Sequence, residues 1–183
     1  FYDVNKGQAW AIKAIDDLYE RGIINGIGNG KFAPKNNITR ADFLIMIMNT
    51  YGIEPDANVI DNFSDAGNRY YTKYLGTAKR LGLVYGTGNN LYLPESSITR
   101  QDMFVIIYRV LNKLGKLPTS TESGKTAFEK FTDIHEINSY AIEALKYFVN
   151  TGIVQGYNNK LNPKAMATRA ESAQVLYNII SKN

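Results

Sequence analysis

The sequence predicts an all-α protein in which three helix-loop-helix repeats share one core. Three observations support this prediction: four landmarks recur in one order three times, apolar residues recur at three- and four-residue spacing, and glycines follow the helical segments. The 183 residues are 44% apolar and 21% charged, which is the composition of a globular protein. A chain of this length buries enough surface to form a core without covalent cross-links.

Each repeat passes through the same four landmarks. It opens with a Phe-x-Asp segment, continues through a Gly-x-x-x-Gly segment and a proline, and closes with a Thr-Arg-x-acid motif. The openings begin at Phe1, Phe63 and Phe131; the glycine segments begin at Gly22, Gly82 and Gly152; the prolines are Pro34, Pro94 and Pro163; and the motifs are Thr39-Arg40-Ala41-Asp42, Thr99-Arg100-Gln101-Asp102 and Thr168-Arg169-Ala170-Glu171. This order predicts repeats over residues 1–62, 63–130 and 131–183 that form one cooperative domain, with a polar surface linker at residues 118–130.

The first helix of each repeat is predicted over residues 8–21, 70–81 and 140–151. In the first of these segments, Ala11, Ala14, Ile15 and Leu18 recur at helical spacing and predict one buried face. A glycine follows each segment at the position where a left-handed residue commonly ends a helix.

The second helix of each repeat is predicted to begin at the Thr-Arg pair and to end near Tyr51, Leu114 or Ser181. Gly52 and Gly115 follow the first two of these helices. In the first copy the helix is apolar on nearly every side, which is typical of a helix in the middle of a core. We therefore expect a pseudo-three-fold, three-pronged arrangement around a central three-helix bundle.

Composition excludes several kinds of chemistry. The chain has no cysteine, which excludes disulfides, zinc ribbons and thiol nucleophiles, and its single histidine, His135, excludes a multi-histidine metal site. No cofactor is predicted. The longest apolar run, residues 43–48, is far shorter than the roughly 20 residues that cross a bilayer, so no membrane insertion is predicted.

Charge and acidic residues disfavour two further classes. The net charge of +4 is spread along the chain without a basic run, so nucleic acid is not predicted as a partner. Asp16 and Asp17 are adjacent and point different ways on a helix, and no other acidic pair recurs. Because glycoside hydrolysis needs two carboxylates that face one cleft, the chain is not predicted to be an enzyme.

The Thr-Arg-x-acid motif has a structural and a functional interpretation. The threonine and the acid three residues later fit a capping box, in which the acid reaches back to the amide of the cap residue. The arginine occupies the first helical position, where its charge opposes the helix dipole. It is predicted either to bind an anion together with the free amides of the helix N-terminus or to pair with an aspartate of a neighbouring repeat: Asp3, Asp65 or Asp133.

Glycines and aromatic residues in equivalent places also allow two interpretations. Gly26, Gly86 and Gly156 suit tight turns, or a close approach of a ligand to the backbone. Trp10, Tyr70 and Tyr140 each lie twelve residues before the glycine that follows the first helix. They are suited either to core and interface packing or to stacking on sugar rings.

Together these repeats resemble the S-layer homology (SLH) domain family. The resemblance rests on three tandem units, each with Phe-x-Asp, a segment like Gly-Ile-Ile-x-Gly, a proline and a closing motif like Ile-Thr-Arg-Ala-Asp/Glu, and it covers essentially the whole chain. It implies an exported bacterial protein held at the cell wall or S-layer. It also implies, as partner, a peptidoglycan-linked secondary cell-wall polysaccharide whose pyruvate ketal is recognised in grooves between the prongs.

The resemblance also implies roles for particular residues. The expected partners of the ketal carboxylate are Arg40, Arg100 and Arg169. The residues expected to hold sugar hydroxyls or to orient the arginines are Asp3, Asp65 and Asp133. The glycines expected to leave room for the sugar are Gly26, Gly86 and Gly156, and the matching aromatics are Trp10, Tyr70 and Tyr140. Departures from the family pattern, such as Ala167 in place of isoleucine, leave open whether the three grooves bind equally.

A different function class remains as an alternative. Helical repeats can present a groove to a peptide, so the chain could be a protein-interaction or S-layer self-assembly module with other surface-layer proteins as partners. The two hypotheses differ in the expected ligand, because only the first requires binding to purified wall polysaccharide.

Overall fold

The computed structural model describes residues 1–119 and 128–181 and is all-α, which confirms the predicted fold class. The α-helices are α1 (Ile12–Glu20), α2 (Arg40–Thr50), α3 (Thr72–Arg80), α4 (Arg100–Lys113), α5 (Ile142–Asn150) and α6 (Arg169–Ile180). The short 3-10 helices are η1 (Lys6–Ala11), η3 (Phe128–Lys130), η4 (Ile134–Glu136) and η5 (Ser139–Ala141). Most of the linker predicted at residues 118–130 lies outside the described residues. Within the described ranges, no helix is long and apolar enough to cross a membrane.

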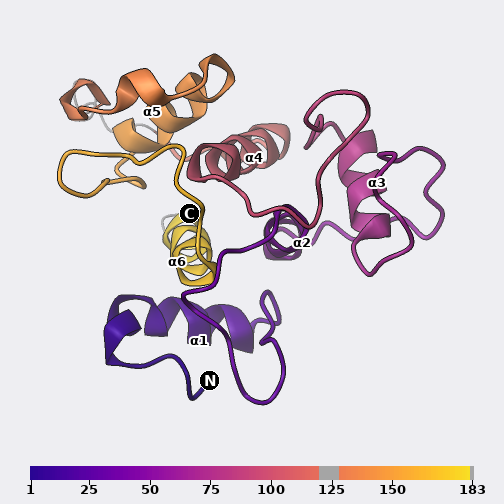
Figure 1. Ribbon diagram of the computed structural model, residues 1–183, viewed down its shortest axis with the longest axis horizontal. Helices are drawn as coiled ribbons and strands as arrows, with labels where there is room; N and C mark the ends of the chain where they lie inside the picture. The colour runs from indigo at the N-terminus through magenta and orange to yellow at the C-terminus, as the bar shows by residue number, and fades with distance from the viewer. Residues whose placement is uncertain (120–127, 182–183) are drawn as a thin grey trace.

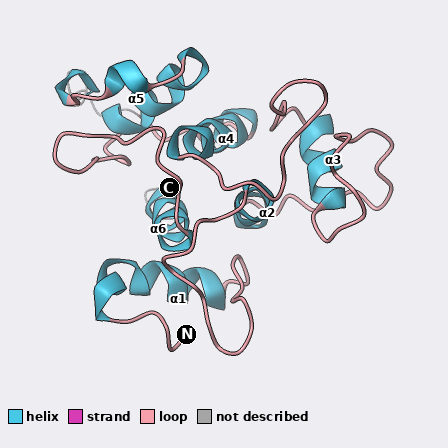
Figure 2. Cartoon of the chain, in the orientation of Figure 1, coloured by secondary structure: helices cyan, strands magenta, loops and turns pink. Residues whose placement is uncertain are grey.

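The helices that follow the Thr-Arg pairs lie in the middle of the molecule. Figure 1 shows α2, α4 and α6 at the centre, with α1, α3 and α5 outside them, and Figure 2 shows the loops that join them. The three central helices begin at the predicted arginines and end within one residue of the predicted positions. The approximate three-fold relation of the repeats remains a prediction.

Each outer helix packs against the central helix of the preceding repeat. The contacting pairs are α3 with α2, α5 with α4, and α1 with α6. The last pair brings the N-terminal repeat against the C-terminal helix, as Figure 1 shows. A helix pair in this protein is therefore assembled from two repeats rather than from one.

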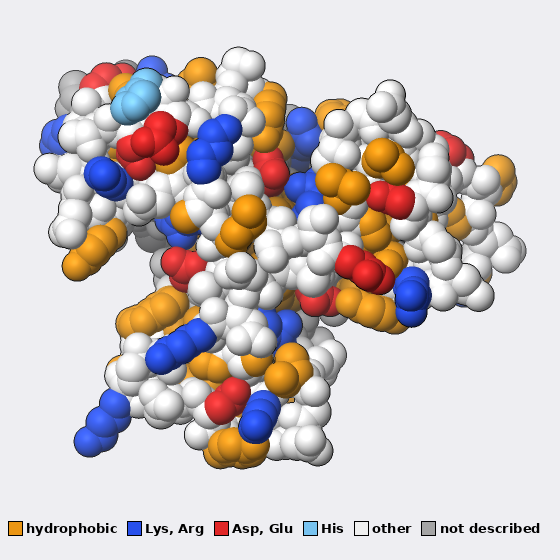
Figure 3. All heavy atoms as spheres, in the orientation of Figure 1, with side chains coloured by type: hydrophobic (Ala, Val, Ile, Leu, Met, Phe, Trp, Pro, Cys, Tyr) orange, Lys and Arg blue, Asp and Glu red, His pale blue; other side chains and the backbone are white. Residues whose placement is uncertain are grey.

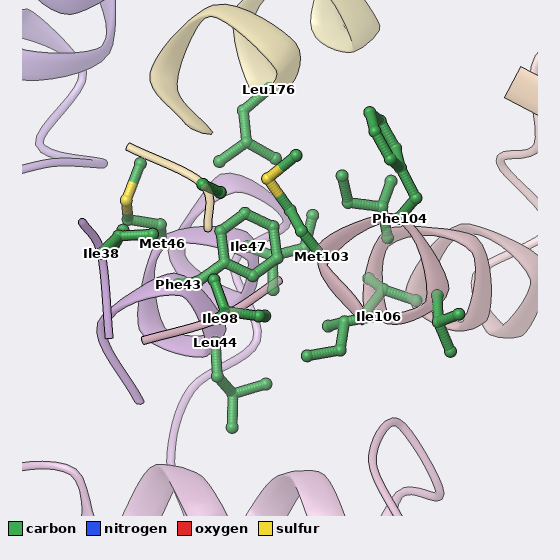
Figure 4. Packing of buried hydrophobic residues seen from close by; sticks show 14 of the residues in the cluster. Ile38, Phe43, Leu44, Met46, Ile47, Ile98, Met103, Phe104, Ile106 and Leu176 are labelled. Carbon is green, nitrogen blue, oxygen red and sulfur yellow. The ribbon is translucent and has the colours of Figure 1, made fainter. Parts of the chain in front are cut away.

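The apolar residues of the central helices form the main core. Phe43 of α2, Met103 of α4 and Leu176 of α6 are fully buried. Figure 4 shows their side chains pointing toward one another between the three helices. This burial explains why the sequence of α2 is apolar on nearly every side, since this helix contacts α3, α4 and α6.

The segments before the central helices form a closed ring of hydrogen bonds. The Ile38 amide donates to the Ala167 carbonyl at 3.0 Å, the Ala167 amide to the Ile98 carbonyl at 2.9 Å, and the Ile98 amide to the Ile38 carbonyl at 3.1 Å. All three residues are fully buried. Because an unpaired buried amide is costly, the loss of one segment destabilises the other two.

The first helix of each repeat is less regular than predicted. In place of one helix over residues 8–21, the chain forms η1 followed by α1, and Gln8 has non-helical backbone angles (φ −121°, ψ 24°). A 3-10 turn, with its tighter hydrogen bonds, is a common way for an α-helix to begin. The predicted left-handed residues are confirmed, since Gly22, Gly82 and Gly152 all have φ of +69°.

Candidate functional site

The N-terminus of each central helix is closed by backbone hydrogen bonds. In α2 the Arg40 amide donates to the Ser96 carbonyl at 2.9 Å and the Ala41 amide to the Pro94 carbonyl at 3.0 Å. The third amide, that of Asp42, donates to Thr39 Oγ1 at 3.0 Å. The same bonds recur at the starts of α4 and α6. The predicted anion site at free helix amides is therefore wrong, because the loop of a neighbouring repeat and the capping threonine already accept from these donors.

The predicted capping box forms in only one copy. Glu171 accepts from the Thr168 amide at 2.8 Å, which completes the reciprocal pair at α6. At α2 and α4 the threonine caps the helix, but the shorter aspartates Asp42 and Asp102 do not close a box. Their carboxylates bond instead to side chains of other repeats.

Each arginine of the motif reaches into a loop of the next repeat. Its Nε donates to a backbone carbonyl: Arg40 to Tyr92 at 2.8 Å, Arg100 to Leu161 at 3.1 Å and Arg169 to Phe32 at 2.8 Å. Where the accepting residue is aromatic, the guanidinium also lies over its ring, at 4.8 Å from the centroid of Tyr92 and 4.6 Å from that of Phe32. These contacts fix the direction of each arginine.

The repeat-opening aspartates hold the same loop residues from the other side. Asp65 accepts from the Tyr92 and Leu93 amides at 2.9 and 2.8 Å. Asp3 and Asp133 make the equivalent pairs of bonds within their own repeats. Burial alone would raise the pKa of Asp3, but the amides of the loop outweigh it and lower that pKa. These aspartates therefore position the loop whose carbonyl receives the arginine, and their predicted contact with sugar hydroxyls stays a prediction.

The internal ion pairs differ from the predicted ones. Arg40 pairs with Asp102 at 3.2 Å and Arg100 with Glu171 at 3.5 Å. Among the described residues, no ion pair joins these arginines to Asp3, Asp65 or Asp133. The predicted pairing of each arginine with an aspartate that opens a repeat is therefore wrong. The acid of the next Thr-Arg-x-acid motif lies closer to the arginine and takes this place.

The aromatic residues at the start of the outer helices lie at the surface, above these acids. Tyr140 donates to Asp102 Oδ1 at 2.6 Å and Tyr70 to Asp42 Oδ1 at 2.7 Å. Burial and the bond to the carboxylate raise the pKa of both hydroxyls, so both tyrosines are neutral donors at ordinary pH. Tyr140, Tyr70 and Trp10 are 52%, 68% and 54% exposed, so core packing is not their role.

One cavity brings together side chains from all three repeats, and we name it the Arg40 groove. It has a volume of about 380 Å³. Its lining includes Arg40 of the first repeat, Gly86 and Asp102 of the second and Tyr140 of the third. Nε and Nη1 of Arg40 are engaged, whereas within the described ranges Nη2 has no hydrogen-bond partner. The groove thus offers one free charged donor beside an exposed aromatic ring.

A second cavity, the Arg100 groove, repeats this combination with other members. Its volume is about 720 Å³, and its lining includes Arg100, Gly156, Glu171 and Trp10. These side chains again come from three different repeats, and the first repeat supplies the aromatic residue, Trp10. The predicted Arg, Gly and aromatic residues therefore meet, but each comes from a different repeat.

The corresponding residues around Arg169 are arranged differently. Two nitrogens of Arg169 donate to backbone carbonyls, Nε to Phe32 and Nη2 to Asn25, both at 2.8 Å. Burial lowers the pKa of this guanidinium, and the charges of Asp42 and Asp3 oppose that shift. The bond to Asn25 turns the guanidinium toward the loop, so the three arginines are not equivalent.

The loop glycines are required by packing within their own repeats. A Cβ on Gly26 would lie 2.6 Å from the Phe1 ring and 2.5 Å from the Lys31 carbonyl oxygen. Gly86 and Gly156 stand in the same relation to Phe63 and Phe131. The close approach that these glycines allow is therefore to the repeat-opening phenylalanine, and their predicted role in leaving room for a sugar stays a prediction.

The acids of the motif are the site residues that the sequence prediction missed. Asp42, Asp102 and Glu171 were assigned to capping, yet all three also contact other repeats. Asp42 and Asp102 accept from tyrosines, and Asp102 and Glu171 pair with arginines. The sequence did hold a sign of this role, because an acid recurs at the same position of all three motifs. Figure 3 shows basic and acidic side chains interspersed on one face of the molecule. This face therefore carries no extended patch of one charge, and an anion would be attracted by single arginines.

Comparisons with known proteins match the three repeats to one family. The S-layer homology domain family matches residues 1–44, 62–104 and 130–173, which is more than half of the chain. The chain is 31% identical over 176 residues to the exoglucanase XynX of Acetivibrio thermocellus, covering 95% of this chain and 16% of that protein. It is 29% identical over 167 residues to the S-layer protein sap of Bacillus anthracis, covering 91% of this chain and 20% of that protein. The chain spans about a fifth or less of the length of these relatives.

Proposed function

We propose that this chain, which belongs to the S-layer homology domain family, anchors the protein that carries it to a bacterial cell wall by binding pyruvylated secondary cell-wall polysaccharide. Relatives with names as different as an S-layer protein and an exoglucanase share a segment like this one. That distribution supports a module that attaches different proteins to one kind of surface. The carrying protein is accordingly exported and held at the cell wall.

The observation that carries the proposal is the convergence of Arg40, Asp102 and Tyr140 on one cavity. The carboxylate of a pyruvate ketal would accept from the free Nη2 of Arg40, a charge-assisted bond in a half-enclosed site. The Tyr140 ring offers a face on which a sugar can pack. Asp102 holds both the arginine and the tyrosine, so the two recognition groups are positioned before a ligand arrives.

The protein itself already uses part of each arginine. Nε and Nη1 of Arg40 and Arg100 each donate one hydrogen bond, so within the described ranges Nη2 is the nitrogen left without a partner and available to an anion. A single charge-assisted bond gives modest affinity at one groove. Simultaneous contact of several grooves with one polymer would raise the overall affinity well above that of each groove.

The same geometry favours binding over hydrolysis. The Arg40 groove contains one carboxylate, that of Asp102, and both its oxygens already accept hydrogen bonds. Glycosidases use two carboxylates on either side of the scissile bond. We therefore propose a binding role, and the chemistry of any catalytic relative belongs to the parts of that protein outside the matching segment.

Calorimetry with two disaccharides tests this function. The ligands are a synthetic N-acetylmannosamine disaccharide that carries a pyruvate ketal and the same disaccharide without the ketal. The expected result is binding of the first and none of the second, with affinity at the Arg100 groove reduced about tenfold by Arg100→Gln. Arg21→Gln removes a surface cation that pairs with Asp17 on α1 and serves as the matched control.

Two results would overturn the proposed function. One is equal binding of the two disaccharides by the unsubstituted chain. The other is unchanged affinity for the ketal in the triple variant Arg40→Gln, Arg100→Gln, Arg169→Gln, with thermal unfolding recorded in parallel to show that the variant is folded. Arg100→Lys is expected to bind the ketal with an affinity between those of the unsubstituted chain and Arg100→Gln, because it keeps the charge and loses the planar donor geometry.

A further inference from the structure

A second arginine, Arg109, lines the Arg40 groove. It lies on α4 seven residues after Asp102, which is two helical turns and about 10 Å along the axis. Side chains on a helix lean toward its N-terminus, so the guanidinium of Arg109 extends back toward Asp102. Arg40 and Arg109 line the same cavity of about 380 Å³, so a disaccharide seated in it lies beside both.

Across residues 1–119 and 128–181, no carboxylate lies within ion-pair distance of the Arg109 guanidinium. Its one close partner is the Tyr85 ring, whose centroid is 4.5 Å from the guanidinium carbon. Tyr85 is 69% exposed and lines the same groove. Burial lowers the pKa of Arg109, and the charge of Asp102 opposes that shift.

The second repeat carries this arginine, and the other two repeats have no cation at the equivalent position. The positions equivalent to Arg109 are Asn49 in the first repeat and Asn178 in the third. Asn49 donates to the Ile23 carbonyl, and Asn178 accepts from Gln174, so both are used locally. In the Arg40 groove two arginines therefore face one carboxylate, Asp102.

We propose that the Arg40 groove binds an acidic oligosaccharide at two points, one anionic group at Arg40 and a second at the platform formed by Arg109 and Tyr85. This inference rests on the proposed function and narrows it: Arg109 is a specificity residue that favours glycans with acidic groups on neighbouring sugars. The contact with the Tyr85 ring uses the face of the guanidinium, so its N–H donors stay available for the second anion.

An NMR titration of the 183-residue chain tests the inference. The probes are a disaccharide with a single pyruvate ketal and the same disaccharide with glucuronic acid as its second sugar, and the readout is the amide shifts of Tyr85 and Thr87 in the groove. The unsubstituted chain is expected to bind the two-charge disaccharide about tenfold more tightly, which corresponds to about 1.4 kcal/mol. Arg109→Gln is expected to bring this ratio close to one, and Arg109→Lys to retain part of it.

Lys113→Gln is the matched control, because it removes an exposed cation from the next turn of the same helix. A wild-type ratio of one, or a ratio that Arg109→Gln leaves unchanged, overturns the inference while the proposed function stands. If neither disaccharide shifts the Tyr85 and Thr87 amides, both the inference and the proposed function of this groove are wrong. If the Lys113→Gln variant loses the preference as fully as Arg109→Gln, the effect is one of general charge and the specific role of Arg109 is excluded.

Discussion

Arg40 and Tyr92, 52 residues apart in the sequence, are joined by three contacts. Arg40 Nε donates to the Tyr92 carbonyl at 2.8 Å, the guanidinium lies 4.8 Å from the Tyr92 ring centroid, and the Tyr92 hydroxyl donates to the Arg40 carbonyl at 3.2 Å. Tyr92 is fully buried, and its amide is held by Asp65. The arginine at the start of one repeat's central helix is thus anchored by the loop of the next repeat.

Removal of the Tyr92 hydroxyl should weaken this anchor without disturbing the packing. Tyr92→Phe is expected to lower the free energy of unfolding by about 1 kcal/mol, the usual contribution of one buried hydrogen bond. Phe32 fills the equivalent position beneath Arg169, so a phenylalanine ring is compatible with the site. Urea unfolding measures the change. Tyr2→Phe, at an exposed ring, is the control and should have no effect.

The ring of hydrogen bonds among Ile38, Ile98 and Ala167 predicts that the repeats unfold together. The three amides are fully buried and bond to three different parts of the chain, so none can open alone. Native-state hydrogen exchange should give all three the same opening free energy, equal to that of global unfolding. Faster exchange at one of them would show that a repeat opens independently.

Gly26 and Gly7, both in the first repeat, provide a matched pair of substitutions. Gly26→Ala would place a Cβ against the Phe1 ring and the Lys31 carbonyl and is expected to cost about 2 kcal/mol of unfolding free energy. Gly7→Ala, whose nearest neighbour would be the Asn5 side chain at 3.4 Å, should stay within about 0.5 kcal/mol of the unsubstituted chain. Neither glycine has positive φ, so the comparison isolates packing. Equal effects of the two substitutions would contradict this account.

The buried hydroxyl of Tyr51 leads us to expect a loss of stability at high pH. Burial raises the pKa of its hydroxyl from 10.0 to about 12, and among the residues that the structure describes that oxygen has no hydrogen-bond partner. A raised pKa in the folded state contributes stability that is complete below the unfolded value of 10.0 and is lost as the pH rises through about 12. Tyr51→Phe should flatten this dependence and stabilise the chain near neutral pH by about 1 kcal/mol. Thermal unfolding across this alkaline range measures both effects, and a steeper loss in the variant would refute the assignment.

Local sequence signals predicted most of the fold. The Thr-Arg pairs gave the starts of the central helices because a threonine cap acts within three residues. Gly22 and its equivalents gave the helix ends because only glycine readily adopts φ of +69°. Where side chains of other repeats offered competing bonds, the same reasoning failed: the Asp102 carboxylate accepts from Arg40 and Tyr140 and does not complete a capping box.

The sequence by itself determined how each repeat folds locally, since helical spacing, caps and left-handed glycines all depend on neighbours a few residues apart. Only the tertiary structure decided which repeats share a groove. The α1 helix packs against α6, so Trp10 of the first repeat meets Glu171 of the third in the Arg100 groove. That pairing depends on how apolar faces far apart in the chain bury one another, and no short-range pattern encodes it.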